Sequence, residues 1–225
     1  KRPAGFMDWR TDSLEELVKT MEEDRNTAKA GPSKYYPHIP LISEPVAYNL
    51  GNTNLPIHPY VLGVLLGDGT LASGPGTQTG FCTADPEIAE RVRSLLPSGV
   101  SMKHHYTRGK VSAYRLIGSV SGPQGRRSIM SSLLSELGLL GAKSRTKFIP
   151  ARYLYADNPE DRLELLRGLI DSDGNEKGLF VVTSKHLAEG LAEIARSLGA
   201  WASFREGANL NGPLYATKVV TDSFD

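Results

Sequence analysis

The sequence has almost no sulfur chemistry and no long apolar run. Cys82 is the only cysteine among 225 residues, which excludes an internal disulfide framework and a cysteine-based zinc site. Its strand-like setting after Phe81 predicts a small buried side chain and not a nucleophile. No apolar stretch reaches the roughly 18–20 residues of a membrane span, and the opening Lys1-Arg2-Pro3 turns polar, unlike a signal peptide. We therefore expect an intracellular protein of the cytoplasm or nucleoid.

Acidic residues are nearly missing from the middle of the chain. The formal net charge is only +1, but residues 91–152 contain a single acid, Glu136. Such segregation of charge indicates a partner that is a polyanion. The alternative is a basic face that is only solvated. His104, Tyr106, Tyr114 and Gln124 stand among the charges as further base or phosphate contacts. The twelve basic residues of this segment are Arg91, Arg93, Lys103, Arg108, Lys110, Arg115, Arg126, Arg127, Lys143, Arg145, Lys147 and Arg152.

A short apolar run that ends in Asp-Gly occurs twice. The copies are residues 61–69 (VLGVLLGDG) and 166–174 (LRGLIDSDG). Each begins with the residues that start helices, Pro59 in the first and the N-cap Asn158 with Pro159 in the second. Gly69 and Gly174 stand where helices often end in a left-handed cap. Both runs therefore predict helices whose last turn carries a carboxylate.

These carboxylates, Asp68 and Asp173, lie at the unfavourable end of a helix. The C-terminus carries about half a negative charge, so an acid there needs a nearby cation. Small residues spaced four apart leave one face of each helix without bulk, so the two helices can approach closely. Packed in this way they bring both carboxylates to a site suited to a divalent metal. The small residues of this helix interface are Gly63, Gly67, Gly168 and Ser172.

Three other interpretations of the repeated run are weaker. Asp-Gly is a common turn dipeptide, which explains a single copy but not two at matched positions. Residues 67–72 loosely fit a dinucleotide-binding fingerprint, but Asp68 would repel a pyrophosphate. Residues 171–175 begin like a calcium loop, which then fails because Glu176 replaces the required glycine and Val182 the final glutamate.

The two runs resemble the paired signature helices of LAGLIDADG homing endonucleases, especially the single-chain type carried inside inteins. Residues 168–174 are almost the family motif, and Asp68 and Asp173 are 105 residues apart, about one αββαββα unit. The resemblance implies an α+β fold in which two pseudo-symmetric αββαββα repeats form a DNA-binding saddle. It further implies that Asp68 and Asp173 hold Mg²⁺, for which Mn²⁺ substitutes. In the same way it implies that Lys147, in Lys147-Phe148-Ile149-Pro150, polarises the attacking water or stabilises developing charge, with an ordinary phosphate contact as the alternative.

On this basis the chain divides into an N-terminal extension (1–57), a first repeat (58–150) and a second, truncated repeat (151–225). The extension is predicted to hold a short helix over 12–21, an exposed connector and an extended arm or strand over 41–50. The first repeat is predicted to have strands at 70–72, 79–83, 100–106 and 111–117, helices at 85–96 and 128–137, and a basic loop at 122–127. The second is predicted to have strands at 178–183, 201–205 and 214–221 and a helix at 185–198, with Thr183 equivalent to Thr83.

The resulting functional hypothesis is a monomeric, metal-dependent endonuclease that cuts a long, specific site in double-stranded DNA. Asp171 points away from Asp173 and is expected to be structural, while a second counterpart of Lys147 would fall near position 252 and is absent from this sequence. A DNA-binding module without cleavage and an RNA maturase remain alternatives. The residues expected to contact DNA are Lys103, His105, Arg108, Lys110, Arg115, Arg126, Arg127, Arg145, Arg205 and Lys218.

Overall fold

The computed structural model describes residues 15, 16, 18, 19, 42, 44–51, 53–72, 78–122, 125–175, 177–209 and 212–220. The chain divides into two compact units, residues 1–40 and 41–225. In the first unit the four described residues are helical, in agreement with the helix predicted over 12–21. The rest of that helix and the connector at 31–37 lie outside the described residues. Among the described residues, none forms a helix both long and apolar enough to cross a membrane.

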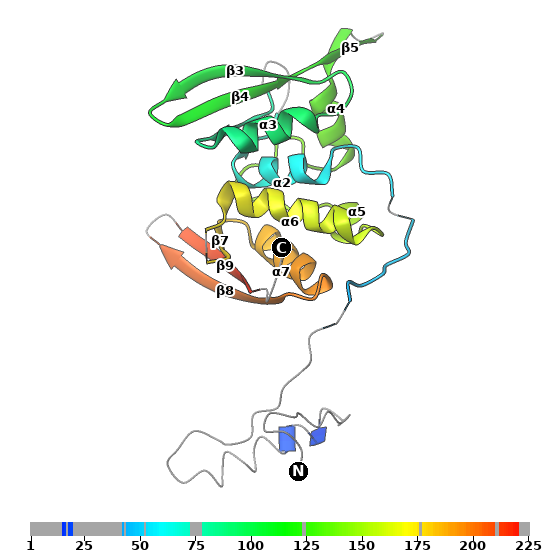
Figure 1. Cartoon of the computed structure of the whole chain (residues 1–225), viewed down its shortest axis with the longest axis vertical. Helices are drawn as coiled ribbons and strands as arrows, with labels where there is room; N and C mark the ends of the chain where they lie inside the picture. Colours follow the sequence, from blue (N-terminus) through cyan, green and yellow to red (C-terminus); the bar gives the residue numbers. More distant parts are fainter. Residues whose placement is uncertain are drawn as a thin grey trace. The chain divides into compact units, whose positions relative to one another are not determined.

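Two parallel helices lie side by side at the centre of the second unit, α2 (Pro59–Gly67) and α6 (Pro159–Asp173) (Figure 1). Both begin as the sequence predicts, with a proline in the first turn and a capping side chain before it. The His58 Nδ1 accepts from the Tyr60 N–H at 3.2 Å, and the Asn158 Oδ1 accepts from the Glu160 N–H at 3.1 Å. These caps satisfy N–H groups that have no partner within the helix.

The first repeat forms a four-stranded antiparallel sheet with the order β1-β2-β4-β3. Its elements are β1 (Gly69–Thr70), β2 (Gly80–Thr83), α3 (Pro86–Ser94), β3 (Ser101–Arg108), β4 (Val111–Ile117) and α4 (Ile129–Glu136). The loop predicted over 122–127 is wrong. Strands β5 (Ser119–Gly122) and β6 (Gly125–Ser128) pair there as a separate hairpin. The backbone of residues 119–122 and 125–128 is satisfied by antiparallel pairing between the two segments.

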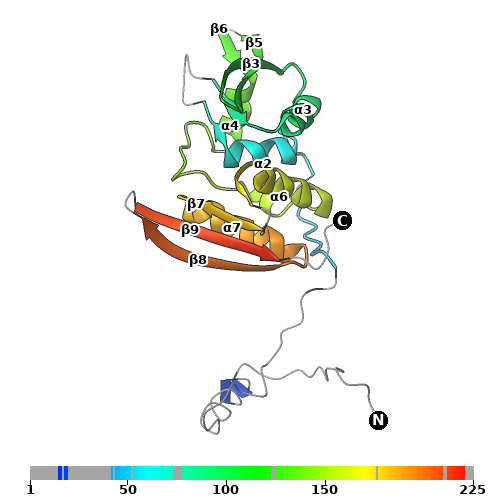
Figure 2. The ribbon, with the colours of Figure 1, turned by 60° about the vertical axis from the view of Figure 1, so that its left-hand side comes forward.

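The second repeat places a three-stranded sheet on the other side of the helix pair, as Figures 1 and 2 both show. Its order, β7-β9-β8, corresponds to β2-β4-β3 of the first repeat. Helix α7 packs between this sheet and α6, where the Thr217 hydroxyl of β9 donates to the Ala188 carbonyl at 2.8 Å. The elements are α5 (Ala151–Leu154), β7 (Leu179–Val182), α7 (Lys185–Ser197), β8 (Trp201–Asn209) and β9 (Gly212–Val220), the last two longer than predicted.

Over β2 and the start of α3 the repeats correspond with an offset of 99 residues, whereas the Asp-Gly ends of the two central helices are 105 residues apart. Gly69 pairs with the buried Phe81, and Gly174 makes an equivalent isolated bridge with the buried Phe180. The N-caps of α3 and α7 are Asp85 and Ser184. The alignment of Thr83 with Thr183 is therefore wrong by one residue, because similar strand sequences do not fix register, whereas the pairing with the glycine does.

The glycines that follow the two aspartates are not left-handed caps, so that prediction is wrong. Gly174 has φ −83°, and Gly69 is not among the residues with positive φ. Their requirement is steric, because the chain turns back over the last turn of its own helix. A Cβ on Gly69 would lie 2.5 Å from the Leu65 Cα, and one on Gly174 would lie 2.6 Å from the Ile170 carbonyl oxygen.

The two helices touch through their backbones. A Cβ on Gly63 would lie 2.5 Å from the Leu165 carbonyl oxygen, and one on Gly168 would collide with the Tyr60 carbonyl. One turn further, a Cβ on Gly67 would overlap the Ser172 hydroxyl. The small faces of both helices thus meet as the sequence predicts. Every residue of α2 from Pro59 to Leu66 is buried, so this contact lies in the core.

Residues 44–51 form an extended arm without strand pairing, and the arm is held on the second repeat. The buried Arg162 guanidinium donates to the Val46 carbonyl at 2.6 Å and to the Ala156 carbonyl. The Asp157 carboxylate accepts from the Leu50 and Gly51 N–H groups, both at 2.8 Å. Charge-assisted contacts of this kind fix the path of the chain into α2.

We expect Gly168→Ala to lower the free energy of unfolding by about 2–4 kcal/mol, because the added methyl group must push α2 and α6 apart in a packed core. Urea unfolding followed by circular dichroism measures the change. Gly207→Ala is the matched control, since its Cβ would lie 4.0 Å from the nearest atom, the Leu214 carbonyl oxygen. That variant is expected to stay within about 0.5 kcal/mol of the parent. Equal effects of the two substitutions would contradict close backbone packing.

Candidate active site

Asp68 and Asp173 lie together at the ends of the paired helices. Asp68 is the C-cap of α2, where its N–H donates to the Val64 carbonyl at 3.1 Å, and Asp173 is the last residue of α6. A Cβ on Gly67, next to Asp68, would lie 3.3 Å from the Cβ of Asp173. Because the helices are parallel and in contact along their length, their final residues meet. We call Asp68 and Asp173 the carboxylate pair.

The pair is electrostatically strained. Burial raises the pKa of the Asp68 carboxyl, the negative charge of Asp173 raises it further, and Lys147 opposes both effects. Burial also raises the pKa of Asp173, again opposed by Lys147. Within the described part of the chain, no hydrogen bond or ion pair satisfies either carboxylate. Asp68 is exposed and Asp173 is partly buried, and two neighbouring acids without a hydrogen-bond or ion-pair partner favour the arrival of a cation.

The carboxylate oxygens of Asp68 and Asp173 suit a hard divalent ion whose remaining coordination positions are filled by other ligands. No group of three or more His, Cys, Asp or Glu side chains suited to a metal occurs among the described residues. Mg²⁺ is commonly bound by one or two protein carboxylates, with water and substrate phosphate oxygens completing its octahedron. The carboxylate pair fits that requirement and does not fit a closed structural site such as zinc forms.

Lys147 reaches the same place from the connector between the repeats. Its side chain is only 4% exposed, and its ammonium donates to four backbone carbonyls at the end of α2. These carbonyls, which we call the carbonyl cradle, belong to Leu65 at 2.9 Å, Leu66 at 2.9 Å, Gly67 at 3.0 Å and Gly69 at 2.8 Å. These contacts are not predictable from the sequence, because nothing in the residue pattern of 65–69 indicates a contact with a distant lysine.

Lys147 supplies the positive charge that the end of α2 requires. The last turn of α2 contains no basic residue of its own. Burial lowers the pKa of Lys147 to about 8, while Asp173 and Asp68 act to raise it. The lysine thus lies beside the carboxylate pair, but its ammonium is directed at backbone oxygens. Its role in polarising a water molecule stays a prediction from the family resemblance.

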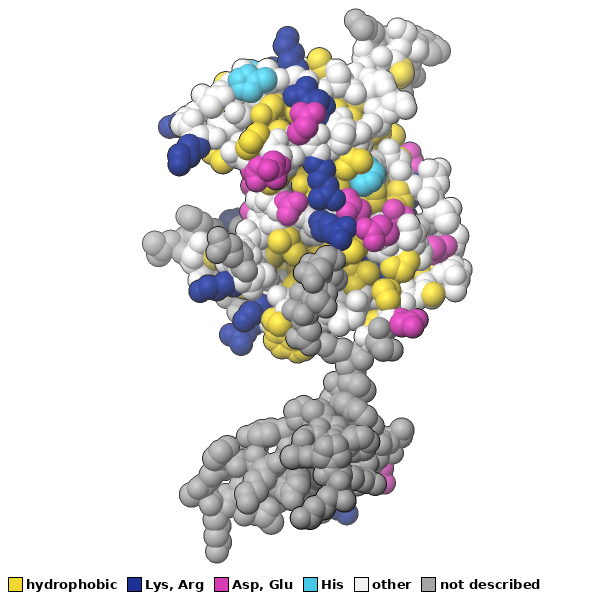
Figure 3. Space-filling model, in the orientation of Figure 1, with side chains coloured by type: hydrophobic (Ala, Val, Ile, Leu, Met, Phe, Trp, Pro, Cys, Tyr) yellow, Lys and Arg dark blue, Asp and Glu magenta, His cyan; other side chains and the backbone are white. Residues whose placement is uncertain are grey.

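Asp171 belongs to the contact between the repeats. Its carboxylate accepts from the Tyr60 hydroxyl at 2.8 Å, and the Arg91 guanidinium lies 4.0 Å from the centre of the Tyr60 ring. Arg91 also donates to both oxygens of Glu164, at 2.7 and 2.8 Å. Figure 3 shows basic and acidic side chains side by side on this face, where the repeats meet (Figure 3). The contact with Tyr60 gives Asp171 a structural role outside the carboxylate pair.

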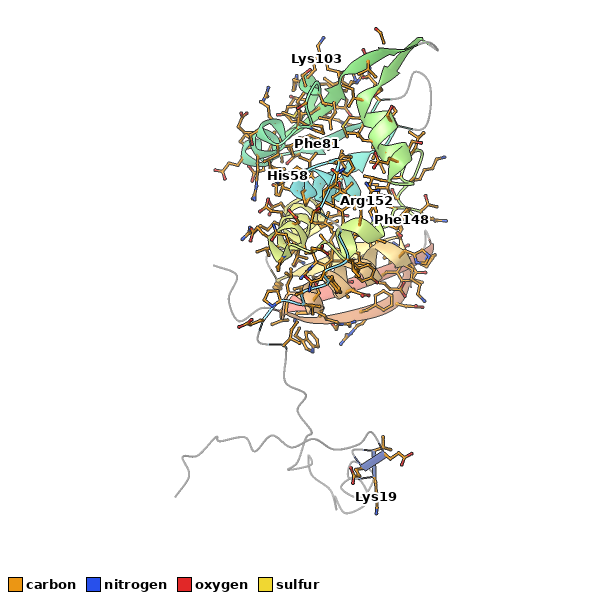
Figure 4. The ribbon with its side chains drawn as sticks, turned by 90° about the vertical axis from the view of Figure 1, so that its right-hand side faces the viewer. Lys19, His58, Phe81, Lys103, Phe148 and Arg152 are labelled. Carbon is orange, nitrogen blue, oxygen red and sulfur yellow. The ribbon has the colours of Figure 1, made fainter. Side chains whose placement is uncertain are left out.

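Five of the residues expected to contact DNA lie on the β3–β4 hairpin. Lys103, His105, Arg108, Lys110 and Arg115 are all exposed. Figure 4 shows Lys103 toward the outer end of this sheet, whereas His58 lies at the level of the central helices (Figure 4). Lys103 and Arg115 are paired in register, and the His105 Nε2 lies 2.6 Å from the Arg115 Nη2. The hairpin therefore presents a compact basic surface, which we call the reading hairpin.

A β-bulge shapes the reading hairpin. The register shifts between His104 and Tyr106, and both His105 and Tyr106 line a hollow beside Arg115. Cys82 lines the same hollow and is half-buried, so the prediction of a buried cysteine is wrong. In a regular strand, consecutive side chains point to opposite faces of the sheet. The bulge instead lets the side chains of His105 and Tyr106 line the same hollow. No local feature of the sequence predicts the bulge.

The other expected DNA contacts are spread over both repeats. Arg126 and Arg127 are on β6, for which only the backbone is described. Arg145 is exposed in the connector, and a Cβ on Gly212 of β9 would lie 3.2 Å from its guanidinium. Arg205 on β8 and Lys218 on β9 are exposed on the second sheet. Basic side chains thus extend from the first sheet through the connector to the second.

Comparison with known proteins yields a family match and one curated relative. Residues 149–215 match the family model described as homing endonuclease. The replicative DNA helicase DnaB of Mycobacterium intracellulare is 31% identical over 157 residues, which are 68% of this chain and 21% of that protein. The chain therefore spans about a fifth of the length of this relative.

Among solved structures, the homing endonuclease I-DmoI is similar to this chain. Its mesophilic variants align with a TM-score of 0.48 and 12% identity, over 72% of this chain and 87% of theirs. I-DmoI in complex with DNA and Mn aligns with a TM-score of 0.47 and 13% identity, over 72% and 88%. The homing endonuclease match covers residues 149–215, which contain α6 with its Asp-Gly end, and it agrees with the resemblance noted in the sequence.

Proposed function

We propose that this protein cuts both strands of a specific double-stranded DNA site with Mg²⁺, as the endonuclease domain of an intein. The observation that carries the proposal is the carboxylate pair, to which each repeat contributes one acid at the end of its central helix. A monomer in which each repeat contributes one acid can act on each of the two strands of one duplex. The preferred ion is Mg²⁺, with Mn²⁺ as a substitute, because all the protein donors are carboxylate oxygens.

The chain's own residues perform three tasks in this reaction. Asp68 and Asp173 would hold the metal ions at the ends of α2 and α6. The ions, when bound, would supply a nucleophilic water at neutral pH and neutralise charge on the scissile phosphate. The partial burial of Asp173 would strengthen the attraction between its carboxylate and a cation. The backbone contact between the helices fixes the spacing of the two half-sites.

Binding would rest on the reading hairpin and the basic side chains that continue from it. A paired strand ribbon fits the DNA major groove, where arginine and lysine contact guanine edges and phosphates. The His105–Arg115 contact restrains the guanidinium and so reduces the entropy it loses on binding. Twelve basic residues against one acid in residues 91–152 would favour the close approach of a long duplex.

The intein setting is supported by the relative. A protein named as a replicative helicase contains a stretch similar to this chain that is only a fifth of its length. An endonuclease carried as an insertion within a host protein explains why that similarity is confined to one part. The DNA target is then the uninterrupted coding sequence at the insertion point, and a replicative helicase gene is the first candidate.

The proposal predicts that plasmids carrying an uninterrupted replicative helicase gene are linearised in Mg²⁺ and stay intact in EDTA. A library of randomised duplexes, selected by cleavage, identifies the site if the helicase gene is not the target. Asp68→Asn and Asp173→Asn are each expected to lower the rate at least about 100-fold, since the metal loses a charged ligand. Gel electrophoresis of the products measures both effects.

Asp171→Asn is the matched control for these variants. It removes one carboxylate two residues from Asp173 but keeps an oxygen that accepts from Tyr60, so cleavage should stay within about three-fold of the parent. Undiminished cutting of both strands by either variant of the pair would contradict the site. A salt-sensitive gel shift without cutting in any metal would instead support a DNA-binding module.

The carboxylate pair also predicts metal-linked stability. With EDTA present, Asp68→Asn should melt no lower than the parent, because the charged form of Asp68 is disfavoured in the fold, as its raised pKa indicates. Addition of Mn²⁺ should raise the Tm of the parent and of Asp171→Asn, but not that of Asp68→Asn. Differential scanning calorimetry measures the three shifts. A metal-induced shift in Asp68→Asn equal to that of the parent would argue against metal binding by the pair.

The reading hairpin predicts a change in salt dependence. Arg115→Gln should weaken binding of the target duplex about 10-fold at 150 mM salt and relax the base preference at one position. Lys103→Gln should instead reduce the slope of log affinity against log salt by about one, with little change in base preference. Fluorescence anisotropy at several salt concentrations separates the two outcomes. Identical behaviour of the variants would mean that the hairpin does not distinguish base from phosphate contacts.

A further inference from the structure

We propose that Lys147 is a positioning residue, which holds the peptide groups on both sides of Asp68 so that this carboxylate faces Asp173 at the spacing that metal binding needs. This inference rests on the proposed function, because it concerns the same site. It differs from the role implied by the family resemblance, in which the lysine acts on the attacking water.

The carbonyl cradle brackets Asp68. Two of its oxygens belong to Gly67 and Gly69, the residues immediately before and after the aspartate, at 3.0 and 2.8 Å from the Lys147 Nζ. The other two, from Leu65 and Leu66, close the last turn of α2. Carbonyls at a helix C-terminus have no partner within the helix. The ammonium thus replaces four separate partners and fixes the backbone that carries Asp68.

The ammonium has no proton left for a water molecule or a phosphate. A protonated lysine carries three N–H donors, and four carbonyl oxygens lie within hydrogen-bond distance of them. With 4% of the side chain exposed, any movement toward the substrate would break charge-assisted bonds in a buried place. The geometry therefore favours an effect through Asp68 over direct contact with the reacting atoms.

The backbone of Lys147 is held by the opposite repeat. The Ser184 hydroxyl, at the N-cap of α7, donates to the Lys147 carbonyl at 2.5 Å. The side chain reaches α2 in the first repeat while the main chain is tied to α7 in the second. Lys147 thereby connects the first carboxylate to the repeat that carries the other one.

The end of α6 is held differently. There the Ser172 hydroxyl donates to the Gly168 and Leu169 carbonyls, at 2.8 and 3.2 Å. That hydroxyl belongs to the helix itself and brings no charge. Within the described residues, Asp173 is therefore positioned by its own helix, and Asp68 by a residue 79 positions further along the chain.

The test is a Mn²⁺ titration followed by electron paramagnetic resonance, with and without a DNA duplex, on the parent and three variants. Lys147→Met should bind Mn²⁺ at least about ten-fold more weakly than the parent, as expected when support for a ligand is lost. This direction is diagnostic, because removal of a nearby positive charge by itself strengthens the attraction for a cation. Lys185→Met removes an exposed lysine paired with Glu206 and should leave the affinity unchanged.

Ser184→Ala is the milder variant that keeps the inference testable if Lys147→Met does not fold. It retains the ammonium but frees the Lys147 carbonyl, and it should weaken Mn²⁺ binding about two- to five-fold. Equal or tighter Mn²⁺ binding by Lys147→Met, or unchanged binding by Ser184→Ala, would overturn the inference, as would a parent that binds no Mn²⁺. A parent that binds Mn²⁺ but never cuts DNA would refute the proposed function alone.

Discussion

The backbone contact between α2 and α6 is the constraint on which the rest of the structure depends. Gly63 and Gly168 leave no room for a Cβ, so the helix axes are held at the distance of touching main chains. Each helix leads directly into the first strand or bridge of its own repeat, through Gly69 and Gly174. The separation of the two sheets follows from one pair of glycines, and under the proposed function it would set the distance between the two DNA half-sites. A contact this close also forces the helix ends together.

That closeness has an electrostatic cost. Two helix C-termini and two carboxylates meet in one place, where Asp68 is exposed and Asp173 is partly buried. Burial and the charge of Asp173 raise the pKa of Asp68, burial raises the pKa of Asp173, and Lys147 opposes both shifts. A site that is strained in this way without a metal gains more from a divalent cation than a relaxed one would. Under the proposed function, the tight packing that organises the fold and the affinity for metal would therefore have a common origin.

The sequence predicted the parts of this arrangement that follow local rules. The starts of α2 and α6 depend on Pro59, Asn158 and Pro159, and the small faces depend on spacing along one helix, so both were visible without a structure. The hairpin of β5 and β6, the bulge that brings Tyr106 beside His105, and the carbonyl cradle of Lys147 depend on contacts between distant segments. Gly69 and Gly174 were assigned to the right positions for the wrong reason, since steric contact with the preceding turn, and not backbone handedness, requires them.

The two repeats contribute equally to the carboxylate pair but unequally to the exposed basic surface. Each supplies one aspartate, but the exposed charges of the first sheet, Lys103, Arg108 and Arg115, have only Arg205 and Lys218 as counterparts on the second. The second sheet also exposes Trp201 and Val220, which are paired in register and 47% and 41% exposed. A basic surface binds through phosphates and guanine edges, whereas apolar side chains contact thymine methyl groups. Under the proposed function, the two half-sites of the DNA would therefore be read by different chemistry, although one pair of helices holds both carboxylates at a fixed spacing.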